Sequence, residues 1–257
     1  MKINFVLGSI ALLGCFSVFG AELDRASVES KLAQQNGNQP ADLRRKDLTD
    51  LDLSGLDFTH ADLWGSDLRR SNLSNSNLSG LVLDLTVMTK INLSGANLTK
   101  TSIFGVHMVG ANLSKANLSQ SRFIANLDRS NLRHANLQEA MWGVDMKNQP
   151  MGLMRVSLNN VDLTGADLTN ADLNRALLRH ATLKGSILRN TNLMGADLSG
   201  ADLSDADLSG ADLSNATLTD TNFSGSNLAK TRFSGIRDKS TIKGFETSKN
   251  FNTAIFD

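Results

Sequence analysis

The chain has 257 residues, no net charge at pH 7 and 40% hydrophobic residues. Its neutrality excludes a whole-molecule field that would attract nucleic acid or an anionic membrane, and its apolar content excludes a disordered protein. Leu, Asp, Asn, Ser, Ala and Gly dominate, whereas the chain has no Tyr, 2 Pro, 2 Trp and 1 Cys. So few residue types indicate a repeated motif rather than a mixed core.

Residues 1–20 have the organisation of a secretory signal peptide. Lys2 provides the positive start, residues 5–13 are mostly apolar but too few to span a bilayer, and Gly20 fits a cleavage site before Ala21. We therefore expect export through the Sec pathway, a periplasmic or secreted mature protein, and no transmembrane span in it. The alternative is an uncleaved apolar N-terminus.

Cys15 offers a second interpretation of this leader. Residues 12–15, of sequence LLGC, resemble a bacterial lipobox, which would make Cys15 the lipidated N-terminus of an outer-membrane lipoprotein. Leu13 and the bulky Phe16 fit that pattern imperfectly, so ordinary cleavage is favoured. Because Cys15 is the only cysteine, cleavage leaves a mature chain without a disulfide or a cysteine-ligated metal.

Residues 21–40 are expected to form an N-terminal helical cap and a linker. Asp24 is a candidate N-cap, Val28 and Leu32 are spaced for one apolar face, and Pro40 follows the end of the helix. We expect this helix to cover the apolar end of the repeat array that follows it.

A large apolar residue recurs at every fifth position from Leu43 to Phe123, and again from Leu153 to Phe233. Two places before this centre lies a small residue, usually Ala or Ser, and one place before it lies Asp or Asn. Ser or Thr follows the centre, and then often Gly, Asn, Lys or Arg. Residues 196–200, of sequence ADLSG, are one of the clearest copies.

A period of five fits neither a helix nor one straight strand, on which the centres would alternate between faces. The pattern is satisfied if the chain turns a corner once per repeat. The small residue and the centre are two positions apart, so both point inward, and the Asp or Asn between them points outward. Four corners close a coil in about twenty residues, and the next coil stacks about 4.8 Å above it.

This geometry predicts a narrow interior whose facing sides lie about 10 Å apart. One large side chain from each side fills the gap, and the small residue fits beneath it. We expect the core to include these centre leucines: Leu163, Leu183, Leu198, Leu203, Leu208 and Leu213.

These residues match the motif A(D/N)LXX, and over residues 41–235 the chain resembles the pentapeptide-repeat proteins. The resemblance implies an all-β fold, a right-handed quadrilateral parallel β-helix. The stacked square coils follow from the spacing as well, whereas the handedness is implied by the family alone.

The repeat is disturbed at residues 124–152. The centre at Leu127 comes one residue early, Trp142 continues that slipped register as a core residue, and the five-residue spacing returns at Leu153. Proline cannot donate to a β-ladder, so we expect a bulge or loop at Pro150. This interruption is either a tolerated corner insertion or a loop placed for recognition.

Residues 236–257 depart from the motif and are expected to form a C-terminal cap. We expect a helical turn at residues 246–250, and Phe251, Ile255 and Phe256 to fold back over the last coil.

Signals of catalysis are weak, and we assign no catalytic, metal-binding or cofactor-binding residue. The four histidines lack metalloprotease spacing, and His60 and His180 fall on outward corners. Asp197, Asp202 and neighbouring aspartates lie around a belt rather than in one cleft, so we assign them a structural task beside the corner backbone. The sequence therefore predicts a protein that is not an enzyme and carries no cofactor.

The outward charges change sign along the chain. Residues 68–134 hold eight Lys and Arg against two Asp, whereas residues 191–228 hold six Asp and neither Lys nor Arg. These are either ordinary solvated surface or patches for different partners, and the outward Trp64 is a candidate contact anchor. The candidate interaction surface is Trp64, Arg69, Arg70, Arg122, Arg129, Arg133, Asp197, Asp202, Asp205, Asp207 and Asp212.

The favoured hypothesis is an exported, non-enzymatic scaffold that binds a protein partner, in a narrower version a secreted bacterial effector. We expect no nucleic-acid partner, and homodimers or end-to-end association are open. One alternative is a DNA mimic, because the resemblance includes relatives that protect DNA gyrase, although the basic middle and the leader argue against it. The other is a β-helix that acts on or binds polysaccharide, although no aromatic-lined groove is visible.

Overall fold

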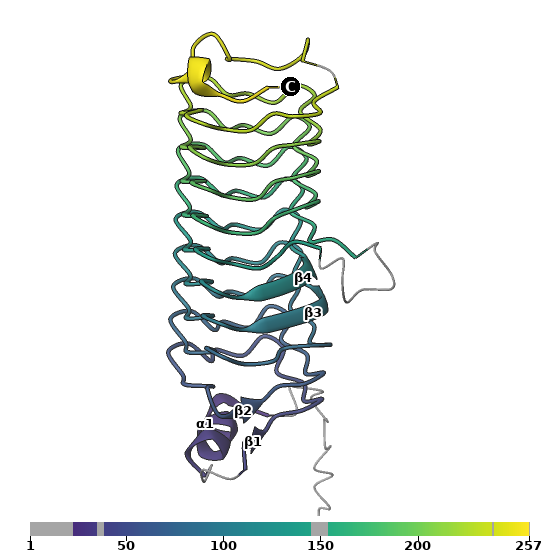
Figure 1. Cartoon of the computed structure of the whole chain (residues 1–257). Coiled ribbons are helices and arrows are strands. Elements are labelled where there is room, and N and C mark those ends of the chain that lie inside the picture. Colours follow the sequence, from purple (N-terminus) through teal and green to yellow (C-terminus); the bar gives the residue numbers. More distant parts are fainter. Residues whose placement is uncertain (1–22, 35–38, 145–153, 238, 257) are drawn as a thin grey trace, which may run out of the picture.

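A computed structural model of the chain describes residues 23–34, 39–144, 154–237 and 239–256. The expected leader with Cys15, and also Pro150 and Leu153, lie outside the described residues. The chain winds as a right-handed quadrilateral parallel β-helix, an upright stack of square coils (Figure 1). The predicted fold class is therefore confirmed.

Each coil has four sides of five residues, so a residue pairs with the residue 20 positions later, as Asp47 pairs with Asp67. The ladder is parallel: the Leu48 N–H donates to the Asp67 carbonyl at 2.8 Å, and the Asp67 N–H donates to the Lys46 carbonyl at 2.9 Å. Most sides contribute too few ladder residues to form extended strands. Four segments qualify as strands: β1 (Ala41–Asp42), β2 (Ala61–Asp62), β3 (Ser102–His107) and β4 (Arg122–Asn126).

We number the sides in chain order from the first coil. The first side contains Leu43, the second Leu48, the third Leu53 and the fourth Phe58. Because the ladder joins each coil to the next in this register, every later repeat keeps its side.

The centre residues of all four sides point inward and form one continuous apolar column. The six leucines named for the core are all fully buried. Small polar residues in this column are satisfied locally, as where the Ser66 hydroxyl donates to the Leu63 carbonyl at 2.6 Å. Among the described residues, no buried side-chain nitrogen or oxygen lacks a hydrogen-bond partner, so the column has no unsatisfied polar side chain to destabilise it.

The corners explain the Asp or Asn of the motif. At most corners the backbone adopts positive φ, which glycine and asparagine tolerate best, as at Gly55 with φ 72°. The outward side chain accepts the N–H two residues later: Thr49 donates to the Asp47 carboxylate at 3.0 Å, and Ser74 donates to the Asn72 amide oxygen at 3.2 Å. The motif residue therefore stabilises the turn beside it.

The predicted register slip occurs where β4 runs straight past a corner. Phe104 of β3 pairs with Ile124, but Val106 pairs with Ala125, so Gly105 is bulged and β4 is one residue shorter. Ile124 and Ala125 are both buried where other coils expose a corner.

Trp142 is in the core, as predicted. Its ring stacks on Phe123 with centroids 4.7 Å apart and planes 5° apart, and its Nε1 donates to the Ser121 hydroxyl at 3.0 Å. The ladder then joins Met141 to Asp172, which are 31 residues apart instead of 20, so the interruption does not break the stack.

Helix α1 (Arg25–Ala33) caps the N-terminal end. The Asp24 side chain accepts the Ser27 N–H at 2.8 Å, and Val28 and Leu32 are buried in the same cluster as the leucine column. Arg25 also donates to carbonyls of the third side, at Asp52 and Ser54. The described residues contain no helix that is long and apolar enough to cross a membrane.

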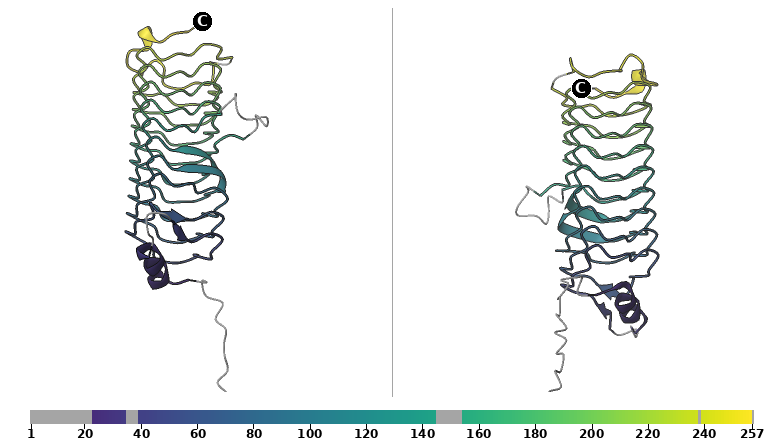
Figure 2. Two further views of the ribbon diagram at one scale, coloured as in Figure 1. Left: turned by 60° about the horizontal axis from the view of Figure 1, so that its bottom comes forward. Right: turned by 180° about the vertical axis from the view of Figure 1, so that it is seen from behind.

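The C-terminal cap is a looser further coil rather than a segment that folds back. Its outward residues Lys243, Lys249 and Ile255 continue the ladder at intervals of 21, 22 and 23 residues. The helical turn predicted at residues 246–250 is wrong, because these residues form turns and the short 3-10 helix η1 (Phe251–Thr253) follows them. α1 and η1 lie at opposite ends of the stack (Figure 2).

Phenylalanines close the C-terminal end of the column. Phe256 stacks on Phe233 with centroids 5.2 Å apart, and Phe245 lies 5.5 Å from Phe223. Aromatic rings thus replace leucine where the coil is too irregular for one side chain per side to fill the interior.

Candidate interaction surface

On the third side, the outward polar side chains of neighbouring coils hydrogen-bond to one another. Its outward amides form a ladder in which Asn72 donates to Asp52, Asn92 to Asn72 and Asn112 to Asn92, at 2.8–3.1 Å. Serine is the commonest residue in the next row, which also holds Arg133 and Lys184. Between residues 41 and 233, the described part of the third and fourth sides exposes no large hydrophobic side chain.

The first side is different, because large apolar side chains stand outward on it. Val82 is 56% exposed, Leu85 55% and Phe104 43%, and Val87, just around the corner on the second side, is 37% exposed. These residues lie on two neighbouring coils, since Val82 pairs with Ser102 and Val87 with His107. We call Val82, Leu85, Val87 and Phe104 the apolar patch.

Leu85 is the least expected member of the apolar patch. It occupies a corner with φ 61°, a backbone conformation that is unfavourable for leucine, on the order of 1 kcal/mol. Lys90 and Arg70 occupy similar corners, but their charged ends are solvated, whereas Leu85 exposes apolar atoms without gaining burial. The stability of the coil therefore does not explain this residue.

Trp64 lies on the first side, one coil before the apolar patch. Its ring is half-buried, with the Arg45 guanidinium 4.8 Å from the ring centroid. The Trp64 backbone N–H donates to the Asp62 carboxylate. The structure thus places the predicted contact anchor beside the apolar patch, with one ring face covered by Arg45.

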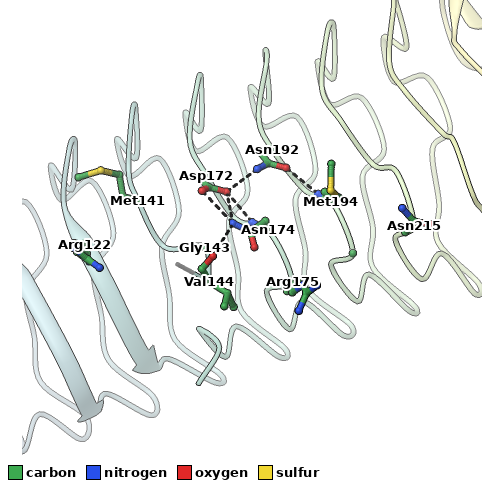
Figure 3. Close-up of a pocket in the computed structure, with 11 residues that line it drawn as sticks. Arg122, Met141, Gly143, Val144, Asp172, Asn174, Arg175, Asn192, Met194 and Asn215 are labelled. Carbon is green, nitrogen blue, oxygen red and sulfur yellow. Dashed lines mark hydrogen bonds between the residues drawn. The ribbon is translucent and has the colours of Figure 1, made fainter. Parts of the chain in front are cut away.

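A hollow of about 770 Å³ lies farther along the first side (Figure 3). Met141 and Met194, 54% and 45% exposed, line it together with Arg122 and Arg175. A second hollow, of about 560 Å³, shares Arg122 and Met141 and reaches Lys100 at the corner between the fourth and first sides. The two hollows thus combine exposed methionines and basic side chains with the acidic Asp172 and Glu139.

The Asp172 carboxylate lines the larger hollow and is engaged in several hydrogen bonds. Asp172 accepts hydrogen bonds from the Asn174 backbone and side chain and from the Asn192 side chain, at 2.9–3.0 Å (Figure 3). A side chain at Gly143 would place its Cβ 2.2 Å from the Asn174 Nδ2, so it would displace the Asn174 and Asp172 side chains from their hydrogen bonds. Asp172 is therefore a structural residue.

The structure shows no metal-binding chemistry on this surface. The described residues contain no group of three or more His, Cys, Asp and Glu side chains that is able to hold a metal ion. His60 and His180 are exposed on corners, as predicted.

The predicted basic residues are dispersed over three places. Arg69 and Arg70, on the second side and its corner, pair with Asp67 and Asp50 at 2.9 and 2.7 Å, and Arg133 on the third side pairs with Asp162 at 3.0 Å. Arg129 is exposed on a corner of the second side, and Arg122 lines both hollows.

The predicted acidic residues are spread over all four sides and are largely compensated. Arg179 binds Asp197 on the second side at 2.5 Å, and Arg189 binds Asp207 on the fourth at 2.6 Å. Asp212 lies 3.7 Å from Arg232 on the first side. Asp202 and Asp205 share the third side and its corner, where Asp205 lies 3.9 Å from Lys184.

These ion pairs keep the carboxylates charged. Burial acts to raise the pKa of Asp197, but hydrogen bonds from Ser199 and Arg179 outweigh it, so the pKa lies below its ordinary value of 3.8. The same balance, with Ser209 and Arg189, lowers the pKa of Asp207.

The apolar patch was missed in the sequence, although a signal for it exists. Val82 and Val87 stand at outward positions where the motif requires Asp or Asn, and Leu85 stands at a corner where Gly or Asn is usual. These departures become one surface only when the coils are stacked at 20-residue intervals.

Comparisons with known proteins agree with this repeat structure. The family model described as pentapeptide repeats matches eight copies, over residues 41–65, 52–89, 91–124, 157–195 and 196–235. No curated protein matches the sequence significantly.

Solved structures of similar proteins include HetL, a pentapeptide repeat protein involved in heterocyst differentiation regulation in the cyanobacterium Nostoc sp. strain PCC 7120. It is 30% identical over 88% of this chain and 94% of HetL, with a TM-score of 0.35. A pentapeptide repeat protein from the Arabidopsis thaliana thylakoid lumen is 36% identical over 37% of this chain and 60% of its own, with a TM-score of 0.29.

QnrB1, a plasmid-mediated fluoroquinolone resistance protein, is 18% identical over 74% of this chain and 91% of its own, with a TM-score of 0.40. At these TM-scores the superpositions carry no argument, and the assignment depends on the matched repeats. These cover most of the chain from residue 41 to residue 235 and have the inward leucines and outward Asp or Asn seen in the coils. The chain therefore belongs to the family of pentapeptide repeat proteins.

Proposed function

We propose that this protein is an exported, non-enzymatic scaffold that binds another protein on the first side of its β-helix. The family often serves as a scaffold for protein interactions. The observation that carries the proposal is the apolar patch: large side chains are exposed on one side of a wall that is otherwise lined with Asp, Asn, Ser and Thr.

The energetics favour protein binding at the apolar patch. Fully burying one Val, Leu or Phe side chain stabilises a complex by about 1.5–3 kcal/mol, so four half-exposed ones contribute on the order of 3–6 kcal/mol before the cost of association. The stacked coils are held by ladders on every side, so little additional ordering of the backbone is required on binding.

The binding surface is tested by crosslinking from single cysteines, which a mature chain without cysteine makes clean. Ser102→Cys lies on the first side beside Val82, and Ser114→Cys, a half-buried serine on the third side, is its control. With a photoreactive group on the cysteine, we expect a discrete adduct with one partner protein from Ser102→Cys.

Adducts of equal yield from both positions, or from Ser114→Cys alone, would contradict docking on the first side. Both variants replace exposed or half-exposed serines, so equal melting temperatures are expected and confirm that the fold is unchanged.

Export is the second part of the proposal, and its support is the leader at residues 1–20. Fractionation of expressing bacteria, with the intact mass of the purified protein, tests it directly. We expect a mature chain that begins at Ala21, in the periplasm or the medium. A chain that retains Met1 and stays in the cytoplasm would overturn export without affecting the binding surface.

A further inference from the structure

The apolar patch is framed by positive charge. Lys100, on the corner between the fourth and first sides, lies two residues before Ser102, which pairs with Val82. Lys90 lies on the far corner of the second side, three residues after Val87, and Arg122 pairs with Ser102 one coil farther along. The apolar side chains thus have cations on both lateral edges and at one end.

Few acidic side chains surround the two lysines of this frame, although Glu139 lines the hollow that Lys100 and Arg122 share. Asp84 is the only Asp or Glu in residues 81–110, and its carboxylate accepts the Phe104 N–H at 2.9 Å. Within the described part of the chain, neither Lys90 nor Lys100 takes part in an ion pair. Several arginines elsewhere are compensated by a carboxylate, as at Arg179 and Asp197.

We infer that the occupant of the apolar patch is a protein segment in which apolar side chains are flanked by Asp or Glu. The inference rests on the proposed docking function and names the chemistry of its partner. The apolar residues of the segment cover Val82, Leu85, Val87 and Phe104, and its carboxylates lie against Lys90 and Lys100. Such a pattern has the apolar centre and charged rim of a transient interface.

A two-fold symmetric dimer of this chain does not fit the same surface. A two-fold symmetric contact places the same apolar patch on both partners. It would therefore bring two positive frames together, and like charges across an interface oppose association. The positive charge around the apolar patch therefore favours an acidic partner segment.

The test is selection of peptides from a displayed random library on the mature chain. We expect the selected peptides to be enriched in Asp and Glu next to Leu, Ile or Phe, and their affinity to fall as salt is raised, because salt screens the rim charges. The best peptide then serves as the probe for defined variants.

Three variants separate the contributions, and each introduces a residue that the fold already accepts at that place. Lys90→Gln with Lys100→Gln removes both lysines of the frame, and Gln120 shows that glutamine is accepted at an equivalent corner, with φ 58°. We expect a loss of about two- to fivefold in affinity for each lysine. Lys115→Gln, on a corner between the third and fourth sides, is the matched control, with unchanged affinity expected.

Leu85→Asn with Phe104→Ser removes the apolar patch, with an expected loss of tenfold or more at about 1.4 kcal/mol per tenfold. If this variant loses the peptide but the lysine variant and Lys115→Gln bind equally well, or the selected peptides are not acidic, the inference is wrong while the docking function stands. If neither variant changes binding, both are wrong. Dimers of the chain that Leu85→Asn dissociates would also overturn it.

Discussion

At the scale of single residues, the repeated Asp and Asn use their oxygens for the backbone of their own coil. Asp202 is representative: its carboxylate accepts the Ser204 N–H at 3.0 Å and the Asn222 side chain, one coil later, at 3.0 Å. The repeated aspartates, which in the sequence look like candidate functional groups, therefore belong to the structure of the corners. Function is instead indicated where the motif residue is missing, as at Val82.

Asp202→Ala is expected to lower the free energy of unfolding by about 1–2 kcal/mol, because two donors lose a common acceptor. The matched control is Asp205→Asn, three residues later on an exposed corner with φ 59°, which keeps a residue suited to that backbone. Chemical denaturation followed by circular dichroism measures both. Equal effects at the two positions would contradict the structural role of Asp202.

Leu85→Asn is expected to stabilise the free protein, by roughly 0.5–1 kcal/mol, because asparagine tolerates positive φ better than leucine. The same substitution is expected to weaken binding, so stability and function would change in opposite directions. A lower melting temperature for this variant would show that Leu85 contributes to the fold and would remove one argument for the apolar patch.

At the scale of elements, the five-residue period predicted the coil, the inward leucines and the register slip at Leu127. It did not predict how β4 makes up for the lost residue, since burial of Ile124 and Ala125 depends on the opposing Gly105 bulge in the previous coil. Nor did it predict the intervals of 21–23 residues in the C-terminal coil, where no motif sets the register.

Trp142→Ala should be among the most destabilising single changes, by about 3–5 kcal/mol, since it leaves a cavity against Phe123 and removes the donor to Ser121. Trp142→Phe, which retains the stacking, should lose clearly less. Thermal unfolding measures the difference, and near-wild-type stability for the alanine variant would contradict the described packing of the slipped coil.

At the scale of the whole molecule, arginines of one coil compensate part of the acidic section in the next coil. Neighbouring coils bring Arg179 to Asp197 and Arg189 to Asp207, 18 residues apart along the chain, so acidic and basic rows compensate each other. The sequence predicted an excess of cations over residues 68–134, but which of them stay unpaired depends on the sides they share. That is why the positive frame of the apolar patch, and not the acidic section, distinguishes the surface.

Acid should destabilise the stack as a whole. The pKa values of Asp162, Asp167, Asp197 and Asp207 all lie below the ordinary 3.8, because hydrogen bonds outweigh the opposing effect of burial. The unfolded chain therefore takes up protons first, so this contribution is complete only well above pH 3.8, declines as the pH approaches 3.8, and is lost as the pH falls through the lowered values. Melting temperatures should be level from neutral pH to about 5 and then fall; an increase on acidification would contradict the ion pairs.

The contact between Met141 and Asp172 has a consequence for how the protein can diversify. These residues are 31 positions apart along the chain, yet they are immediate neighbours in the ladder, next to the point where Gly143 leaves the coil. Because the coils before and after this point pair directly with each other, the stack does not depend on the length of the segment that connects them. Residues inserted after Gly143 would therefore add new binding surface to the first side without changing the structure of the other coils.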